Sequence, residues 1–137
     1  DLPGQVLFQY LDAGGAAHPV TSGDVNEWLR ANGAEGFTAK HFRTFGASAL
    51  AFGLLAQAGG RTRLKPLLTE VSARLGNTPA VARKSYIHPA VIVAALDPPE
   101  RDWRLPRASR WLSPAERGLI AFLTERCRGA DDGAAAE

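Results

Sequence analysis

Apolar residues recur at helical spacing through the middle of this 137-residue chain, and glycine or proline interrupts the pattern at intervals. One stripe at i, i+3, i+4 and i+7 consists of Leu64, Leu67, Leu68, Val71 and Leu75. Such a stripe forms the buried face of an amphipathic helix. Gly76 follows it directly and suits the left-handed conformation that ends many helices. The sequence therefore predicts a mainly α-helical fold.

Helix-start signals divide the rest of the chain into short helices. Their N-cap residues are Ser22, Thr38, Thr78, His88 and Ser113. Proline follows the caps at 78, 88 and 113, at the first helical position, where its missing N–H costs nothing. Glu116 completes a capping box with Ser113, which predicts a last helix over residues 114–127. Residues 5–12 form an apolar run that fits either a strand or one helical turn, so at most a short strand is expected near the N-terminus.

One compact domain is expected over residues 1–128, because a chain that is 45% hydrophobic and 22% charged can build a core. The segment 129–137 is small and acidic and is expected to be a disordered tail. The chain contains no methionine and begins at Asp1, so we interpret it as a piece of a longer polypeptide. No apolar run reaches the length of about 18 residues that spans a bilayer, and the single cysteine, Cys127, fits a reducing compartment. We therefore expect a cytoplasmic protein without a membrane partner.

Positive charge is concentrated in the middle of the chain. Residues 1–36 carry a net charge of −4 and residues 89–137 a net charge of −1, whereas residues 37–88 carry +7. Glu70 is the only acidic residue of that basic block. Such a block attracts a polyanion, usually nucleic acid, although a solvated basic face is the alternative interpretation.

Tyr86 stands inside the basic block, close behind Arg83 and Lys84. A phenol becomes a useful nucleophile at neutral pH only where nearby cations favour its ionised form. Arginine suits the stabilisation of a phosphoryl transition state, because its planar guanidinium stays charged and donates two parallel hydrogen bonds. The pattern permits an attack by Tyr86 on a phosphate, but a half-buried structural tyrosine is the commoner explanation for such a residue.

Two segments resemble the type IB DNA topoisomerases. Residues 37–45, FTAKHFRTF, resemble the segment that delivers a phosphate-binding arginine from the start of a helix. Residues 75–86, LGNTPAVARKSY, are similar to the active-site segment of the same family, with a polar residue nine positions before the nucleophile. Residues 25–29 resemble the bacterial, poxvirus-like branch. The resemblance covers most of residues 5–96 and implies the carboxy-terminal part of a catalytic domain.

The resemblance implies a role for each matching residue. Tyr86 would form a 3′-phosphotyrosyl bond with duplex DNA, and Arg43 and Asn77 would bind the non-bridging phosphate oxygens. Further DNA contacts are expected from Lys40, Thr44, Arg83 and Lys84. Supercoils would relax without ATP, metal or any other cofactor. Asparagine at position 77 is similar to the bacterial branch, whereas eukaryotic and viral members usually carry histidine, so we expect a bacterial enzyme. We also expect it to be monomeric and associated with the nucleoid.

One part of the family's catalytic set has no match in the chain. A second arginine and a general-acid lysine precede the arginine segment in the family, but Arg30 is the only basic residue of residues 1–36. Both are expected upstream of Asp1, so the fragment should be inactive or nearly so by itself.

Two other functions remain open from the sequence. A tyrosine recombinase would use the same nucleophile and related arginines, but it generally carries His-x-x-Arg where this chain has Lys40 and Arg43. A non-catalytic DNA-binding module would use only the positive charge. Four further residues are expected to have structural roles. His88 is expected to make a local hydrogen bond, and Trp28, Trp103 and Trp111 are expected to pack in the interior.

Overall fold

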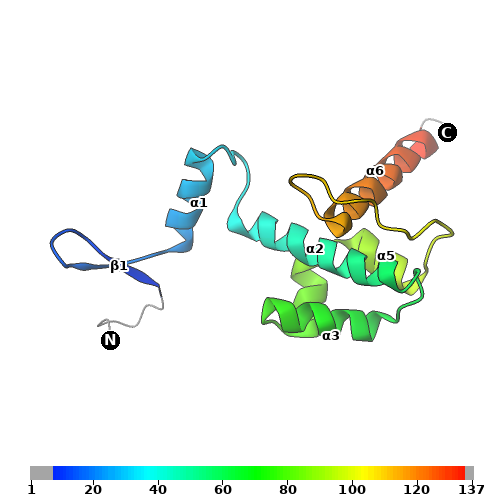
Figure 1. The fold of residues 1–137 in the computed structure, drawn as a ribbon, viewed down its shortest axis with the longest axis horizontal. Helices are drawn as coiled ribbons and strands as arrows, with labels where there is room; N and C mark the ends of the chain where they lie inside the picture. The colour runs from blue at the N-terminus through cyan, green and yellow to red at the C-terminus, as the bar shows by residue number, and fades with distance from the viewer. Residues whose placement is uncertain (1–7, 135–137) are drawn as a thin grey trace. The chain divides into compact units, whose positions relative to one another are not determined.

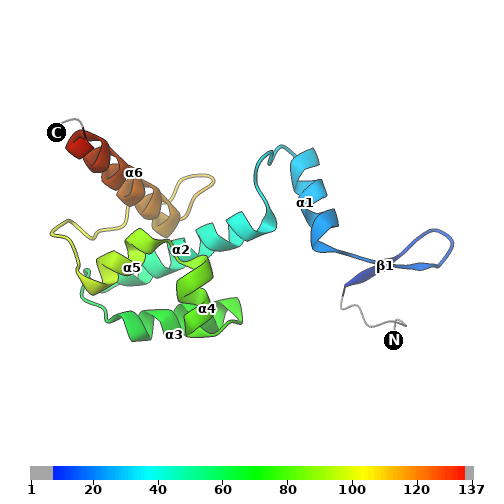
Figure 2. The same ribbon diagram turned by 180° about the vertical axis from the view of Figure 1, so that it is seen from behind.

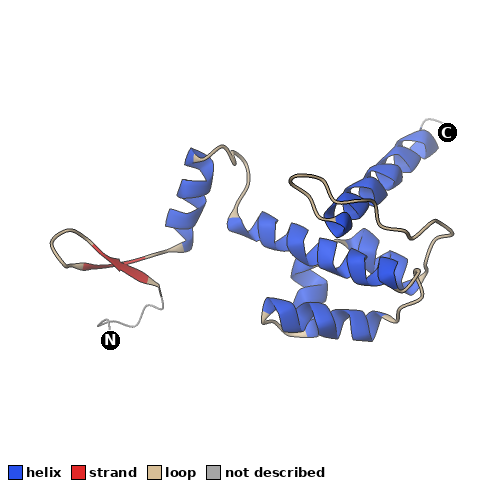
Figure 3. Ribbon diagram, viewed as in Figure 1, coloured by secondary structure: helices blue, strands red, loops and turns tan. Residues whose placement is uncertain are grey.

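The computed structural model describes the backbone of residues 8–134 and the side chains of residues 8–128. Helices dominate these residues, and the only sheet among them is a two-stranded hairpin near the N-terminus (Figure 3). The predicted mainly helical fold is confirmed. The chain divides into two compact units, Asp1–Phe42 and Arg43–Glu137, and each is described by itself.

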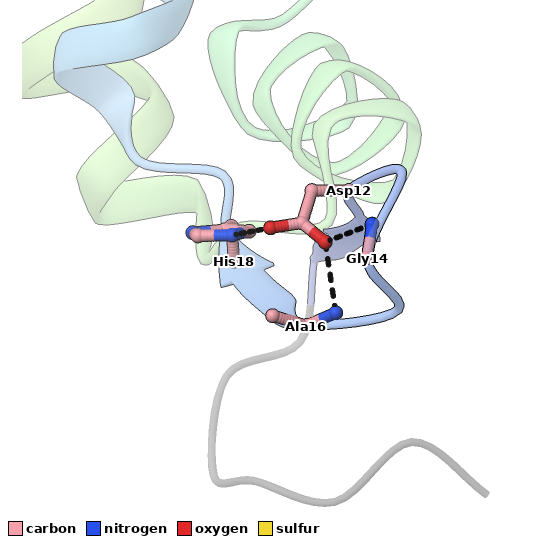
Figure 4. Close-up of polar contacts among 4 residues, drawn as sticks. All are labelled: Asp12, Gly14, Ala16 and His18. Carbon is pink, nitrogen blue, oxygen red and sulfur yellow. Dashed lines mark hydrogen bonds and ion pairs between the residues drawn. The ribbon is translucent and has the colours of Figure 1, made fainter.

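The first unit begins with the antiparallel strands β1 (Gln9–Leu11) and β2 (Ala17–Pro19), which pair Tyr10 with His18. The side chain of Asp12 closes the turn between them, because its Oδ1 accepts the N–H groups of Gly14 and Ala16 at 2.9 Å (Figure 4). Its Oδ2 lies 2.8 Å from Nε2 of His18. The undecided run 5–12 thus contains a strand at 9–11, and residues 5–7 lie outside the described part.

Helix α1 (Ser22–Ala31) completes the first unit together with the start of α2. Thr21, one residue before the predicted cap, forms a capping box with Asp24. Asn26 Oδ1 accepts the N–H of Ala39 at 2.9 Å and so ties α1 to the first residue of α2. No residue of α1 is buried, and Trp28 is 63% exposed. The prediction that Trp28 packs in the interior is wrong, because the unit is too small to cover this face of the helix.

The second unit packs the helices α2 (Ala39–Gln57), α3 (Leu64–Leu75), α5 (Pro89–Leu96) and α6 (Pro114–Ala134) around one core. Its most deeply buried large side chains are Phe122, Leu55, Leu119, Val71 and Val91. In Figures 1 and 2, α3 lies on one side of α2 and the loop that precedes α6 lies on the other. Small residues allow α2 and α6 to approach closely, since a Cβ added at Gly53 would lie 3.0 Å from Ala115.

The helix boundaries follow the predicted signals in the second unit. Gly76 ends α3 in the left-handed conformation, with φ of 66°. Thr78 accepts the N–H of Val81 at 3.3 Å and caps α4 (Pro79–Val81). His88 Nδ1 accepts the N–H of Ala90 at 3.1 Å and caps α5, which confirms the expected local hydrogen bond. The helical segment between these caps is not a continuous α-helix, however, because residues Ala82–Tyr86 form the π-helix η1.

A loop over residues 97–113 connects α5 to α6. Ser113 and Glu116 form the predicted capping box at the start of α6. The helix continues to Ala134, beyond the predicted end at residue 127 and into the segment for which a disordered tail was expected, because no proline interrupts it. Trp103 packs against Phe52 as expected, with ring centroids 6.1 Å apart, whereas Trp111 is 79% exposed, so its predicted packing is wrong. None of the helices within residues 8–134 is both long and apolar enough to cross a bilayer.

Candidate active site

Arg43 is held at the junction of α2, α3 and η1. Its Nη2 donates a hydrogen bond to the carbonyl oxygen of Leu75, the last residue of α3. Its guanidinium carbon lies 5.0 Å from the centroid of the Tyr86 ring, at cation–π distance. The structure therefore brings together two of the three predicted catalytic residues, from segments far apart in the sequence.

Tyr86 is the last residue of the π-helix η1. The N–H of Ile87 donates to the carbonyl of Ala82 at 3.0 Å, five residues earlier, which is the π-type hydrogen bond. One extra residue in the turn rotates the following side chains relative to an α-helix, and such turns occur frequently at functional sites. The Tyr86 side chain is half-buried against the core. The structural packing that we weighed for this tyrosine is thus real, and it coexists with the contact to Arg43.

Ser48 connects α2 to the backbone on both sides of Ile87. This serine is 2% exposed, and its Oγ accepts the N–H of His88 at 2.9 Å. The hydroxyl proton can be donated to the carbonyl of Thr44 at 2.7 Å or to that of Tyr86 at 3.2 Å. Because the bonds to His88 and Tyr86 span 40 and 38 residues, they fix the end of η1 on the helix that carries Arg43.

Asn77 lies two residues after the carbonyl that Arg43 binds. Its backbone N–H donates to the carbonyl of Ser72 at 3.0 Å and completes the end of α3. The side-chain Nδ2 is buried and makes no hydrogen bond to any residue that the structure describes. A buried donor without a partner costs about 1–3 kcal/mol, so its retention calls for an explanation such as a ligand.

The predicted DNA-binding residues occupy two places. Lys40 is exposed on the first turn of α2, one turn before Arg43, and Arg83 and Lys84 are exposed on η1. Thr44 is half-buried, next to Arg43 in the sequence. The three cations are therefore open to solvent on the same two elements that carry Arg43 and Tyr86.

Comparison with known proteins identifies the family of the chain. The family model described as eukaryotic DNA topoisomerase I, catalytic core, matches residues 1–95. That match covers more than half of the sequence and includes Arg43, Asn77 and Tyr86. The chain belongs to the type IB DNA topoisomerase family. A search of curated proteins found no match to the sequence.

The match divides this topoisomerase chain into two parts. The segment that it covers includes all elements from the hairpin through most of α5, together with the predicted catalytic and DNA-binding residues. Residues 96–137 lie outside the match, and they include the loop 97–113 and helix α6. Among the side chains of residues 8–128, no group of three from His, Cys, Asp or Glu is placed to hold a metal ion.

Sequence reasoning missed Ser48 and the Leu75 carbonyl in the candidate site. A signal for Ser48 was present, because it is a lone hydroxyl in the apolar run GASALAFG, and a polar side chain on a buried helix face needs a hydrogen-bond partner. The Leu75 carbonyl carried no such signal. Every residue has a carbonyl, and only the packing of α3 near α2 places this one beside Arg43.

Proposed function

We propose that this chain is the carboxy-terminal part of a bacterial, poxvirus-like type IB topoisomerase and that Tyr86 is its nucleophile. In the proposed reaction the phenol loses its proton to solvent as its oxygen attacks a phosphorus of duplex DNA, and the bond from phosphorus to the 5′-oxygen breaks. The products are a 3′-phosphotyrosyl bond and a 5′-hydroxyl strand, which can swivel and attack back. Because one phosphodiester replaces another, relaxation of supercoils needs no ATP.

The observation that carries the proposal is the position of Arg43 over the Tyr86 ring. Its guanidinium carbon lies 5.0 Å from the ring centroid, and its Nη2 donates to the carbonyl oxygen of Leu75, two residues before Asn77. A guanidinium fixed over the ring of the nucleophile can bind a non-bridging phosphate oxygen, where negative charge sits in the transition state. The packing contacts hold this cation in place before DNA binds. Preorganisation of this kind lowers the barrier, because the donor need not be ordered during the reaction.

Asn77 is proposed to bind a second non-bridging oxygen through Nδ2. Its donor is buried without a partner among the described residues, which supports the presence of an acceptor in the functional complex. An amide cannot exchange a proton with the substrate at neutral pH, so this role is restricted to binding and electrostatic stabilisation. Asparagine at this position is also the feature that favours the bacterial branch over the eukaryotic and viral ones.

The proton for the leaving 5′-oxygen is proposed to come from a lysine outside this chain. Lys40 is the first lysine of the sequence, and no position before it matches the family's general acid. We therefore expect residues 1–137 alone to cleave normal DNA very slowly.

A substrate that needs no general acid tests the nucleophile directly. We would use duplexes with one sulfur atom in place of the bridging 5′-oxygen and random base pairs around it. A thiolate leaves without a proton, because the pKa of a thiol is about 8.5. Residues 1–137 should then form a covalent adduct that survives denaturation, and Tyr86→Phe should form none.

The controls separate the rival functions. Tyr10→Phe changes the other tyrosine and should leave adduct formation unchanged. An adduct from Tyr86→Phe would show that another residue is the nucleophile. If neither wild type nor Tyr86→Phe forms an adduct, either with the sulfur substrate or in the longer polypeptide, a non-catalytic DNA-binding module would be favoured. An adduct that forms only at one target site and is followed by strand exchange would favour a tyrosine recombinase.

A further inference from the structure

A short arginine- and tryptophan-containing segment lies outside the part of the chain that matches the family. Residues 103–112, WRLPRASRWL, carry three arginines and no acidic residue. They belong to the loop before α6, whereas the family match ends at residue 95. The candidate active site therefore does not account for this concentration of positive charge.

The end of this segment is a closed turn. The N–H of Ser109 donates to the carbonyl of Leu112 at 2.9 Å, and the N–H of Leu112 donates back to Oγ of Ser109 at 3.1 Å. These two bonds place Arg110 and Trp111 together at the tip. Because the turn is already formed, a partner that binds the tip would not have to order it.

Arg110 and Trp111 form an exposed pair at the tip. The guanidinium carbon of Arg110 lies 4.6 Å from the centroid of the Trp111 ring, and Trp111 is 79% exposed. Trp103, in the same loop, packs on Phe52, so a tryptophan of this loop need not be exposed as Trp111 is. A tryptophan fixed in solvent beside a cation is typical of a binding surface.

The base of the loop is anchored to α6. Arg117 Nη1 donates to the carbonyl of Arg107, and Leu105 packs on the bare backbone of Gly118, where a Cβ would lie 3.1 Å away. Arg104, directly before Leu105, has a side chain that is 91% exposed, and its Nε lies 3.5 Å from Oδ1 of Asp102. The loop therefore presents its arginines from a fixed base.

We infer that the Arg110–Trp111 turn, together with Arg104 and Arg107, is a second DNA-binding surface that holds the phosphate backbone of duplex DNA. The inference rests on the family's DNA substrate and does not depend on the nucleophile. Arginine binds phosphate through two donors, and the indole packs against sugars or bases. The loop lies on the side of α2 opposite α3 (Figures 1 and 2), whereas the Arg43 site joins α2 to α3. The two surfaces can therefore bind different parts of one duplex.

Salt-dependent DNA binding tests the inference. Fluorescence anisotropy of a labelled random-sequence duplex would be measured with residues 1–137 over a range of salt concentrations. Each phosphate contact contributes about 0.9 to the slope of log K against log salt. The triple variant Arg104→Ala, Arg107→Ala and Arg110→Ala should lower this slope by about 2–3 and weaken binding at low salt at least about tenfold. Trp111→Ala should weaken binding by about threefold or more without changing the slope.

A matched variant controls the measurement. Trp28→Ala removes another exposed tryptophan from a segment of net charge −4 and should bind as wild type. The measured quantity is binding and not cleavage, so a failure of the proposed nucleophile would leave this test intact. Melting temperatures of all variants should agree, because the changed side chains lie on the surface.

Binding unaltered in both the triple variant and Trp111→Ala would overturn the inference, and the turn would then be a protein-binding surface. A single charge-conserving variant, Arg110→Lys, should keep the slope and lose only part of the affinity, since lysine lacks the planar fork. An equal loss in Trp28→Ala and Trp111→Ala would likewise contradict a specific role for the turn.

Discussion

The N–H of His88 donates a hydrogen bond to the buried hydroxyl of Ser48 at 2.9 Å, and the same hydroxyl lies 3.2 Å from the carbonyl oxygen of Tyr86. One side chain on α2 thus holds the backbone on both sides of Ile87. Since α2 also carries Arg43, the serine fixes the distance between the arginine and the tyrosine more directly than the hydrophobic core does. We regard Ser48 as a positioning residue, because it contacts only protein groups.

Ser48→Ala should therefore impair catalysis more than stability. The variant removes the partner of the His88 N–H from a partly buried hydrogen bond, which should cost about 1–3 kcal/mol. The rate of adduct formation should fall by at least about tenfold, because a displaced nucleophile loses its alignment with phosphorus. Ser72→Ala is the matched control, since Ser72 is equally buried but donates only to Thr69, within its own helix. Equal effects of the two variants on adduct formation would show that Ser48 has only a structural role.

Gly60→Ala should destabilise the second unit strongly. Gly60 has φ of +79°, and a Cβ there would lie 2.5 Å from Nε1 of Trp103. The left-handed conformation costs an alanine about 1–2 kcal/mol, and the clash should add about 1–3 kcal/mol. Gly59 has φ of +59° but no atom within 4 Å of the added Cβ, so Gly59→Ala should show the conformational cost alone. Urea denaturation of both variants measures the difference, and equal free energies of unfolding would contradict it.

The parts of the fold that depend on local chemistry could be predicted from the sequence. Gly76 ends α3 and Thr78 caps α4 because each acts on backbone groups within a few residues. The stripe from Leu64 to Leu75 forms a helix for the same reason, since its spacing alone defines a buried face. These signals also placed Arg43 near the start of a helix and Tyr86 near the end of another.

The features that depend on long-range packing could not be predicted. The π-helix that ends at Tyr86 is coupled to Ser48, whose partners lie 38 and 40 residues away. Strand β2 has no alternating pattern, and its pairing depends on the side chain of Asp12. The sequence gives no sign that Trp111 is exposed, because a large apolar side chain is expected to be buried unless the structure shows where the core ends.

The N-terminal hairpin should lose its closed turn in acid. The hydrogen bond with His18 and then that with the N–H of Ala16 lower the pKa of Asp12 below its usual value of 3.8. A carboxyl group with a lowered pKa in the folded state stabilises the fold above its unfolded pKa, and this contribution is lost as the pH falls through the lowered value. The protection of the Gly14 and Ala16 amides, relative to their intrinsic exchange rates, should therefore fall below about pH 4. Asp12→Asn should abolish this pH dependence, and protection that persists unchanged to the lowest pH in wild type would refute the assignment.

Asn77→Ala should separate function from stability more clearly than any other change in the site. Its Nδ2 has no partner among the described residues, so truncation removes a buried donor without breaking a hydrogen bond of the side chain. The free energy of unfolding should therefore stay equal or rise, while the rate of adduct formation falls by about 10²–10³, the usual cost of losing one donor to a transition state. Asn77→Asp keeps the shape but replaces the donor with an anion facing phosphate, so its rate should be lower still. A rate for Asn77→Ala that matches wild type would remove the asparagine from the proposed mechanism.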